Sequence, residues 1–290
     1  MKRLMKRRQL ITGAIALAAA QIPLAHAVAA RPKKVTVRNS RELFEAIGSD
    51  REIYLEPGLY DLGSLSGDTE LSSPHIRFNQ VFDGVETIIQ NVQNLTLVGP
   101  SDLRAKLYAR PRYANVLPLE NSQEVSLKSL ELGHWPDQGY CSGAVVQYTD
   151  CDRLSIEDSV LFGSGTYGIS ALRASTLKCE GTKIHDCTYG ILTLRDCVDL
   201  QFKDCQLVEN QEYSGILATN VRRLSFEECT FADNWFKNEF FVMRGNDPIH
   251  LKDCQFSRNS STSLATQPSL LKLDRVEFTG NSFPVPARSR

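Results

Sequence analysis

The sequence predicts an all-β fold, a parallel β-helix of about eight coils closed by an N-terminal helix, and three observations support this prediction. A block of eight residues with mostly apolar side chains at offsets 0, 2, 5 and 7 occurs seven times between residues 125 and 278. Successive blocks begin 22 to 29 residues apart. Cysteine and asparagine also recur at fixed positions of neighbouring blocks. Self-similarity at a period of roughly 20–50 residues is typical of solenoids.

Residues 1–27 are predicted to be an export signal. A basic stretch, Lys2 to Arg8, precedes an apolar run from Leu10 to Ala20 and a small-residue site at Ala25-His26-Ala27. The run is shorter than the ~20 residues of a membrane-spanning helix, so we expect no membrane insertion. Arg7-Arg8-Gln9-Leu10-Ile11 resembles the twin-arginine export motif, with Lys6 where Ser or Thr is usual; an ordinary secretory signal is the alternative. We expect a periplasmic or secreted bacterial protein.

Residues 28–282 are expected to form the solenoid domain, and residues 283–290 a C-terminal tail. The whole chain has 33 basic and 34 acidic residues, but five of the basic residues lie in the export signal. The remainder is therefore acidic, which argues against nucleic acid as a partner. We expect a monomer.

An N-terminal cap is predicted before the repeats. Ser40 is the expected N-cap of a helix from Arg41 to Ile47. Strands are expected over 52–56 and 59–62, on either side of a turn at Pro57-Gly58. The open end of a solenoid exposes its core, and an amphipathic helix would cover it.

Each block predicts two strands joined by a corner. Offsets 0 and 2 place two side chains on one face of a strand, and offsets 5 and 7 do the same for a second strand. The change of parity requires a corner between the strands, where an acidic residue usually stands. A third strand follows, beginning at Gly168, Gly190 and Gly215 in three of the coils. Three short strands in about 23 residues form one coil, stacked ~4.8 Å from the next. The blocks begin at Val125, Leu154, Leu177, Leu200, Leu224, Ile249 and Leu271, with an earlier copy at 94–97.

Two columns of identical residues support this register. Cys205, Cys229 and Cys254 share one inward position, and we expect them, with Cys179 and Cys187, to be buried free thiols. Whether Cys141 pairs with Cys151 stays open. Asparagine side chains in the second column can hydrogen-bond along the axis; they are Asn210, Asn234, Asn259 and Asn281. No cysteine or histidine spacing fits a metal site, so we expect no metal and no cofactor.

The outer face of the third strands is expected to be mostly apolar, without the acids that catalysis would need. The residues assigned to this face are Ser170, Leu172, Leu192, Leu194, Leu217, Thr219, Val242 and Arg244.

Several segments resemble a known family. Glu42–Ile47 followed by Ile53–Tyr60, with the repeated Tyr-Gly-Ile of Tyr167–Ile169 and Tyr189–Ile191, resembles the pectate-lyase-like right-handed parallel β-helix superfamily over about residues 35–282. Val81–Gly84, Gly133–Cys141 and Gly163–Gly168 are similar to segments of uncharacterised exported bacterial β-helix repeat proteins. The resemblance implies a right-handed coil and a carbohydrate substrate.

The chain departs from the catalytic motifs of that superfamily. The Asn-Thr-Asp, Gly-His-Gly and Arg-Ile-Lys motifs of polygalacturonases are absent. Asp247-Pro248-Ile249-His250 does not match the Asp-Pro-His-Asp of alginate epimerases. The family's reactions are therefore not carried over to particular residues.

The long turn before each third strand is the predicted binding site. Aromatic faces one coil apart could stack on successive sugar rings, or they could simply make the turns rigid. The candidates are Trp135, Tyr140, Tyr167, Tyr189, Tyr213 and Trp235, with Tyr167 and Tyr189 at the same offset. Arg110 and Arg112, in an irregular segment, could grip uronate or sulfate groups; solvated charge is the alternative.

The same turns hold the catalytic candidates. Asp186, Glu209 and Asp233 follow the last buried position in three successive coils, and His134 stands in that column two coils earlier. A carboxyl of raised pKa beside an ionised one is the arrangement that glycosidases use. The alternative is a solvated acidic row, with His134 as a polar surface residue.

The predicted function is binding of an extracytoplasmic polysaccharide or oligosaccharide, and whether a bond is broken stays open. An enzyme of this kind would be a polysaccharide lyase, a glycoside hydrolase or an epimerase. The alternative is a non-catalytic scaffold or surface-interaction protein.

Overall fold

The computed structural model describes residues 31–64, 73–135, 142–245 and 247–284. Sheet A holds β1 (Lys33–Val37), β2 (Arg51–Leu55), β6 (Gln93–Val98), β9 (Gln123–Lys128), β12 (Asp152–Glu157), β15 (Ser175–Glu180), β18 (Val198–Lys203), β22 (Arg222–Glu227), β26 (Ile249–Lys252) and β28 (Leu271–Asp274). Sheet B holds β3 (Gly58–Asp61), β7 (Ala105–Ala109), β10 (Glu131–His134), β13 (Val160–Phe162), β16 (Lys183–His185), β19 (Gln206–Val208), β23 (Thr230–Ala232), β27 (Gln255–Ser257) and β29 (Glu277–Thr279).

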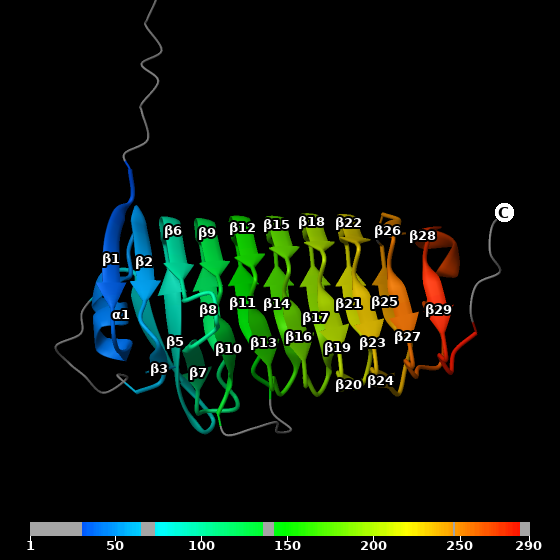
Figure 1. Cartoon of the computed structure of the whole chain (residues 1–290), viewed down its shortest axis with the longest axis horizontal. Helices are drawn as coiled ribbons and strands as arrows, with labels where there is room; N and C mark the ends of the chain where they lie inside the picture. The colour runs from blue at the N-terminus through cyan, green and yellow to red at the C-terminus, as the bar shows by residue number, and fades with distance from the viewer. Residues whose placement is uncertain (1–30, 65–72, 136–141, 246, 285–290) are drawn as a thin grey trace, which may run out of the picture. The chain divides into compact units, whose positions relative to one another are not determined.

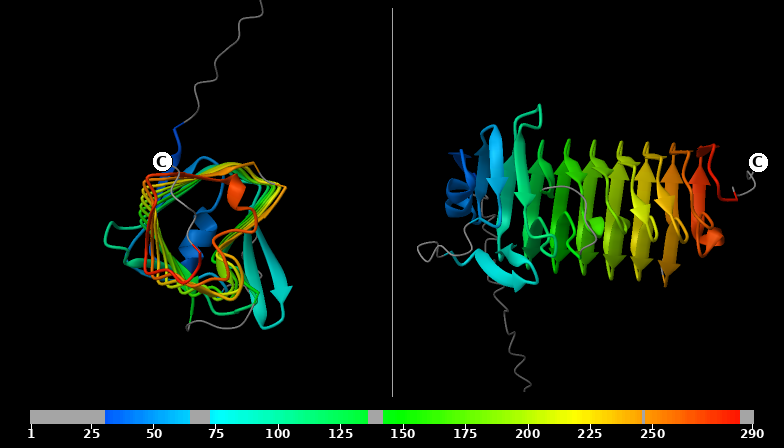
Figure 2. Two further views of the ribbon diagram at one scale, coloured as in Figure 1. Left: turned by 90° about the vertical axis from the view of Figure 1, so that its right-hand side faces the viewer. Right: turned by 90° about the horizontal axis from the view of Figure 1, so that it is seen from below.

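Sheet C completes each coil. It holds β4 (Ile76–Val81), β5 (Gly84–Gln90), β8 (Leu117–Glu120), β11 (Val146–Thr149), β14 (Tyr167–Leu172), β17 (Gly190–Arg195), β21 (Ile216–Thr219) and β25 (Phe241–Arg244). A small ladder joins β20 (Gln211–Glu212) to β24 (Trp235–Phe236). Neighbouring strands in the described residues pair in parallel except β4 and β5, which form an antiparallel hairpin that projects from the coils (Figures 1 and 2). The predicted parallel β-helix is confirmed.

The N-terminal helix α1 (Ser40–Ala46) closes the first coil, as predicted. It buries Leu43 and Phe44 and lies across the open end of the core in the axial view of Figure 2. Its N-cap is Asn39, whose side chain accepts a hydrogen bond from the backbone N–H of Glu42 at 2.9 Å. The prediction of Ser40 as N-cap is therefore wrong by one residue: Ser40 is the first helical residue. At the other end, η1 (Pro268–Leu270) precedes β28, and Phe283, the first residue of the expected tail, is buried.

The predicted inward positions form continuous buried columns. In sheet A, Leu154 aligns with Leu177, Leu200 and Leu224 in successive coils. Offsets 0, 2, 5 and 7 are buried in the blocks from 125 to 256, whereas Leu273, Val276 and Phe278 of the final coil are only partly buried. The cysteine column is also inward and buried, as predicted. One side chain at each position therefore packs on its counterpart in the next coil.

The coils turn at residues in the left-handed conformation. Between sheets A and B, Asp158, Asp204, Glu228 and Asp253 have φ of 46° to 56°. A Cβ atom makes this conformation unfavourable, least so for Asp and Asn, and glycine, which lacks a Cβ, adopts it freely. Asp158, Gly181, Asp204 and Asp253 fit this preference, whereas Ser129, Glu228 and Arg275 adopt the same conformation at this corner of other coils.

Ion pairs link equivalent corners of neighbouring coils. Arg173 pairs with Asp150 at 2.6 Å, Arg258 with Asp233 at 2.6 Å, and Arg275 with Asp253 at 2.5 Å. The pairs are well exposed, so solvent screens each of them strongly. Their repetition supports one register rather than adding a large energy at one point.

These pairs predict a loss of stability in acid. Hydrogen bonding to arginine lowers the pKa of Asp150, Asp233 and Asp253 below its ordinary value of 3.8. A carboxyl with a lower pKa in the folded state stabilises the fold above its unfolded pKa, and the contribution disappears as pH falls through the folded pKa. We expect a thermal midpoint that is steady above about pH 5 and falls below about pH 4. Circular dichroism melts test this; a midpoint that rises on acidification would contradict it.

The asparagine column is a hydrogen-bonded ladder, as predicted. The side-chain Nδ2 of Asn210 donates to Oδ1 of Asn234 at 3.1 Å, Asn234 donates to Asn259 at 2.8 Å, and Asn259 donates to Asn281 at 2.9 Å. Each Nδ2 also donates to a backbone carbonyl of the preceding coil. Asn210, Asn234 and Asn259 are almost fully buried, so the ladder satisfies polar groups inside the turn.

The predicted outer face of sheet C is partly wrong. Gly190 aligns with Tyr167, not with Gly168, because the strands of these two coils pair 23 residues apart, whereas the two Tyr-Gly-Ile motifs are 22 residues apart. Leu192 and Leu194 are consequently inward and fully buried. Their places on the outer face are taken by Thr193 and Arg195, so this face is more polar than the sequence offsets suggested.

Candidate functional site

The exposed aromatic side chains gather on one side of the coil. Six large apolar side chains of the described residues are exposed, and five of them are aromatic. Tyr113, Trp135, Tyr213 and Trp235 lie in the turns that lead from sheet B to sheet C. Phe82, at the tip of the β4–β5 hairpin, contacts Tyr113 with ring centroids 5.1 Å apart. We call this side the B–C ridge; it comprises residues 82–83, 110–116, 135, 142–145, 163–167, 186–189, 209–215 and 233–240.

The middle of the ridge is a stacked tyrosine pair. The rings of Tyr189 and Tyr213 are 4.6 Å apart and almost parallel, at 5°. The predicted match of Tyr167 with Tyr189 is wrong by one residue, because Tyr167 aligns with Gly190. Tyr167 is half-buried, and this burial raises the pKa of its hydroxyl. The stack makes two neighbouring turns rigid and leaves Tyr213 exposed to solvent.

Trp235 is held by backbone and by a lysine. Its strand β24 pairs with β20 of the preceding coil, and its backbone bridges to Ser260 of the following coil. The Lys237 ammonium lies 5.8 Å from the indole centroid and forms an ion pair with Glu212 at 2.6 Å. The Trp235 indole is therefore fixed in place while about half of the residue remains exposed.

Arg110 belongs to the same ridge, at its N-terminal end. Its guanidinium pairs with Asp61 at 2.7 Å and lies 5.7 Å from the ring centroid of Tyr108. The Tyr108 ring in turn meets Trp135 edge to face at 6.5 Å. The hydrogen bond to Asp61 raises the pKa of Arg110, which stays a cation. The sequence placed Arg110 and Arg112 in a separate irregular segment, whereas this segment is the B–C turn of its own coil.

The turn 110–116 is clamped from several sides. The Asp83 carboxylate accepts hydrogen bonds from the backbone N–H groups of Arg112 and Tyr113, at 2.7 and 3.2 Å. A Cβ on Gly84 would lie 2.5 Å from the ring of Pro111, and one on Gly143 would lie 1.9 Å from a backbone oxygen of the turn. Val81–Gly84 and His134 of the segment Gly133–Cys141, which the sequence analysis singled out, converge on this turn, His134 through its contact with Ala114. Because these segments are far apart in the sequence, their contacts could not be predicted from it.

A buried carboxylate supports the same turn. Glu86 is 6% exposed and accepts hydrogen bonds from the backbone and side-chain nitrogens of Asn115, at 2.7 and 2.6 Å. Asn115 also donates to Gln147 at 3.0 Å and accepts from the backbone of Ala144 at 2.9 Å. The sequence analysis missed Glu86 and Asn115, and no motif marks them.

His134 is not a surface residue. It is 1% exposed at the end of β10, and its Nε2 lies 2.7 Å from the Ala114 carbonyl oxygen. Its Nδ1 has no hydrogen-bond partner among the described residues. Burial lowers the pKa of His134, so the neutral form is favoured. His134 was a catalytic candidate on the expectation of an exposed turn residue, and that expectation is wrong. The side chain is buried and contacts the 110–116 turn through Ala114.

The three ridge acids are corner residues with partners. Asp186, Glu209 and Asp233 have φ of 55° to 58°, in one left-handed column. Asp186 pairs with His185 at 2.6 Å, Glu209 with Lys183 at 3.6 Å and Asp233 with Arg258. Their side chains are 44%, 56% and 44% exposed. Arg258 lowers the pKa of Asp233, which is the opposite of what a general acid needs. This geometry favours the solvated acidic row over a shared-proton pair.

Two predicted features remain to be placed. Tyr140 and Cys141 lie outside the described residues. Within the described residues, no three or more His, Cys, Asp or Glu side chains are grouped to hold a metal ion. No helix of the described part is long and apolar enough to span a membrane.

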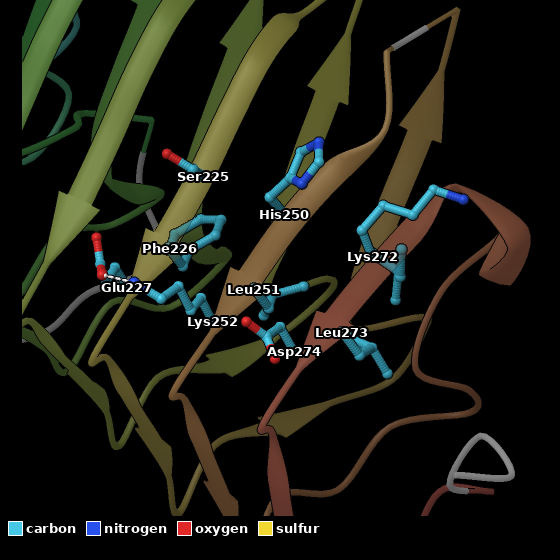
Figure 3. Close-up of a pocket in the computed structure, with 10 residues that line it drawn as sticks. Ser225, Phe226, Glu227, His250, Leu251, Lys252, Lys272, Leu273 and Asp274 are labelled. Carbon is cyan, nitrogen blue, oxygen red and sulfur yellow. Dashed lines mark hydrogen bonds and ion pairs between the residues drawn. The ribbon is translucent and has the colours of Figure 1, made fainter. Parts of the chain in front are cut away.

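A second surface feature is a shallow depression on sheet A. It has a volume of about 490 Å³ and crosses β22, β26 and β28, with His250 between Ser225 and Lys272 (Figure 3). A smaller hollow of about 290 Å³ adjoins it and shares Ser225 and His250. Glu227 and Lys252 form an ion pair across its floor. Glu227 is paired with Lys252 and Asp274 with Arg275, and its walls hold no exposed aromatic ring, so it is a weaker candidate than the ridge.

Comparisons with known proteins agree with this architecture. The model of a family described as right handed beta helix region matches residues 140–284, half of the chain. No curated protein matches. Among solved structures, pectate lyase Pel9A is 10% identical with a TM-score of 0.52, and the alignment covers 89% of this chain and 82% of the lyase. Escherichia coli ybhc is 12% identical with a TM-score of 0.50, covering 94% of this chain and 89% of its own.

At identities this low, the structural matches establish the fold only, and the activity has to be argued from the site. The fold is a right-handed parallel β-helix with the pectate-lyase-like arrangement of sheets, as the sequence resemblance implied. The chain belongs to the right-handed β-helix family.

Proposed function

We propose that this protein binds an extracytoplasmic polysaccharide along the B–C ridge. The observation that carries the proposal is the gathering of five exposed aromatic side chains on one side of the coil. Exposed aromatic rings that a soluble domain does not bury mark a contact surface. Sugar rings have apolar C–H faces that pack on aromatic rings while their hydroxyl groups remain hydrated.

The dimensions suit an extended polymer. Trp135 and Trp235 lie four coils apart, which is roughly 19 Å at the ~4.8 Å spacing of parallel strands. The Tyr189–Tyr213 stack lies between them, and Phe82 and Tyr113 extend the row toward the hairpin. The ridge therefore offers aromatic contacts over several sugar units. A chain lying along the axis would meet contacts in successive coils.

Polar groups beside the rings supply orientation. Arg110 adjoins Tyr108 and Trp135, and Lys237 adjoins Trp235. Both cations keep donors near the rings while paired with Asp61 and Glu212. Hydroxyl groups of a sugar are acceptors and donors for such charge-assisted bonds. We propose binding without bond cleavage at the ridge acids, because those acids are exposed corner residues held by Lys183, His185 and Arg258.

Alanine at the two tryptophans is expected to weaken binding. Trp235→Ala and Trp135→Ala each remove an exposed ring, and we expect a loss of about 1 kcal/mol each, roughly fivefold in Kd. A glycan array on the full chain identifies a ligand, and titration calorimetry measures the variants. Leu59→Ala is the control, because Leu59 is a large apolar residue that is also exposed, on sheet B and away from the ridge. Equal affinity of both tryptophan variants and wild type would place binding elsewhere, and failure on every glycan would favour a scaffold.

The acids provide the separate test of catalysis. Asp186→Asn and Glu209→Gln keep the side-chain size but remove the carboxylate, so fold and most binding should be retained. Product analysis on any glycan hit should show no turnover in wild type. Turnover that is present in wild type and absent in these variants would overturn the non-catalytic reading, since general acid–base catalysis needs an exchangeable proton.

A further inference from the structure

Seven cysteines are free and buried in the described residues. They are Cys151, Cys179, Cys187, Cys197, Cys205, Cys229 and Cys254. Burial raises the pKa of Cys187 to about 12 and that of Cys151 to about 11, so these thiols are inert at neutral pH. So many reduced thiols are unusual in a chain that carries an export signal, because periplasmic and secreted proteins meet an oxidising environment.

The native coil offers these thiols no disulfide. Cys205, Cys229 and Cys254 stack in one column, where parallel register makes their Cβ atoms point the same way. The sulfurs of Cys179 and Cys205 are 3.8 Å apart, in van der Waals contact and not bonded, and both cysteines are free. The sulfur atoms instead donate to backbone carbonyls, for example Cys229 to Phe202 at 3.4 Å. The folded protein uses its cysteines as small core residues.

Cysteines that are neighbours in sequence lie at different corners of the coil. Cys187 is in the asparagine column between sheets B and C, and Cys197 is at the corner between sheets C and A. The six residues of β17 separate them, which is roughly 20 Å of extended strand. A disulfide requires Cα atoms within about 7 Å. A bridge between Cys187 and Cys197, or across β18 between Cys197 and Cys205, would therefore prevent the coil from forming.

An unfolded chain that entered an oxidising compartment would form such bridges first, because short loops close most readily. Folding before exposure to the oxidant removes the hazard, since the thiols are then enclosed. The sequence Arg7-Arg8-Gln9-Leu10-Ile11 resembles, apart from Lys6 before it, the motif of an export system that reads two consecutive arginines. We infer that this chain folds in the reducing cytoplasm and is exported already folded by the twin-arginine translocation machinery. The inference rests on the extracytoplasmic location proposed above.

Export of signal variants in a bacterial host tests the route. Arg7→Lys with Arg8→Lys keeps the charge of the signal but removes the pair, and the control Lys2→Arg with Arg3→Lys keeps both charge and pair. We expect wild type and control in the periplasm, and at least a tenfold loss of export for the pair variant, with folded precursor in the cytoplasm. The signal lies outside the mature domain, so the fold is unaffected. Undiminished export of the pair variant would overturn the inference.

Thiol mapping tests the reason for the route. Native alkylation of periplasmic wild type followed by mass spectrometry should label none of the seven cysteines, and unfolding without reductant should expose all of them. The same mature chain behind a signal that exports unfolded proteins should be protease-sensitive, with disulfides between sequence neighbours. A folded, fully reduced product by that second route would overturn the inference. Wild type retained in the cytoplasm as precursor would instead overturn the export proposal itself, while glycan binding by the purified chain would stand.

Discussion

Phe226→Asp is expected to leave no folded protein at ambient temperature. Phe226 is 1% exposed and contacts three other rings: it stacks on Phe202 at 5.0 Å and meets Phe231 and Phe241 at 5.5 and 6.2 Å. Losing a buried phenylalanine alone costs about 3–5 kcal/mol. An unpaired carboxylate at that position adds the free-energy cost of its desolvation. The sum approaches the free energy of unfolding of a whole domain, which is about 5–15 kcal/mol.

Far-UV circular dichroism measures this outcome as loss of the β signal. Ser225→Asp is the matched control, because Ser225 is the preceding residue of β22 and lies on the outer face of sheet A. The control should melt within about 0.5 kcal/mol of wild type, as surface substitutions do. A well-folded Phe226→Asp variant would show that the inward register of sheet A is misassigned.

Asn234→Leu is expected to be the second most damaging change. Asn234 donates to the Leu207 carbonyl and to Asn259, both at 2.8 Å, and accepts from the backbone and side chain of Asn210 at 2.9 and 3.1 Å. Leucine has a similar size but leaves these buried partners unsatisfied, at about 1–3 kcal/mol for each group. We expect a total loss of about 3–5 kcal/mol and a thermal midpoint roughly 10 °C lower.

Thermal melts of Asn234→Leu and of a control variant check the ladder. Asn238→Ala is the control, because Asn238 is an exposed asparagine four residues further along the same turn. Its midpoint should stay within about 2 °C of wild type. Equal losses in both variants would mean that the turn as a whole, rather than the ladder, is sensitive. No loss in Asn234→Leu would show that water replaces the missing hydrogen bonds.

The inward columns could be predicted because they depend on local rules that repeat. Side chains alternate along a strand, so apolar offsets 0 and 2 fix one buried face without knowledge of any other coil. Asp158, Asp204 and Asp253 mark corners because the left-handed conformation favours aspartate at single positions. Seven copies of one pattern then identify the stacking, since a coil can bury its face only on another coil.

The ridge could be predicted only in part, because a repeated motif need not follow the register of the strands. The Tyr-Gly-Ile motif matched Tyr189 with Tyr167, whereas the strands place Gly190 beside Tyr167, and the Tyr189 ring stacks on Tyr213 of the following coil. The same shift exchanged Leu192 for Thr193 on the outer face of sheet C. A slip of one residue reverses inside and outside in a strand, so an alignment by motif assigned the wrong residues to that face.

The sequence alone determined the β-helix, the inward columns of cysteines and asparagines that contain Cys229 and Asn234, and the aromatic character of the turns. The tertiary structure alone decided that Arg110 joins Trp135 through Tyr108, that Glu86 and Asp83 brace the 110–116 turn, and that His134 is enclosed. The reason is physical. The same packing repeats in every coil, so the sequence pattern shows it many times. The end of the ridge depends on one projecting hairpin, whose contacts occur once and join segments about 30 residues apart.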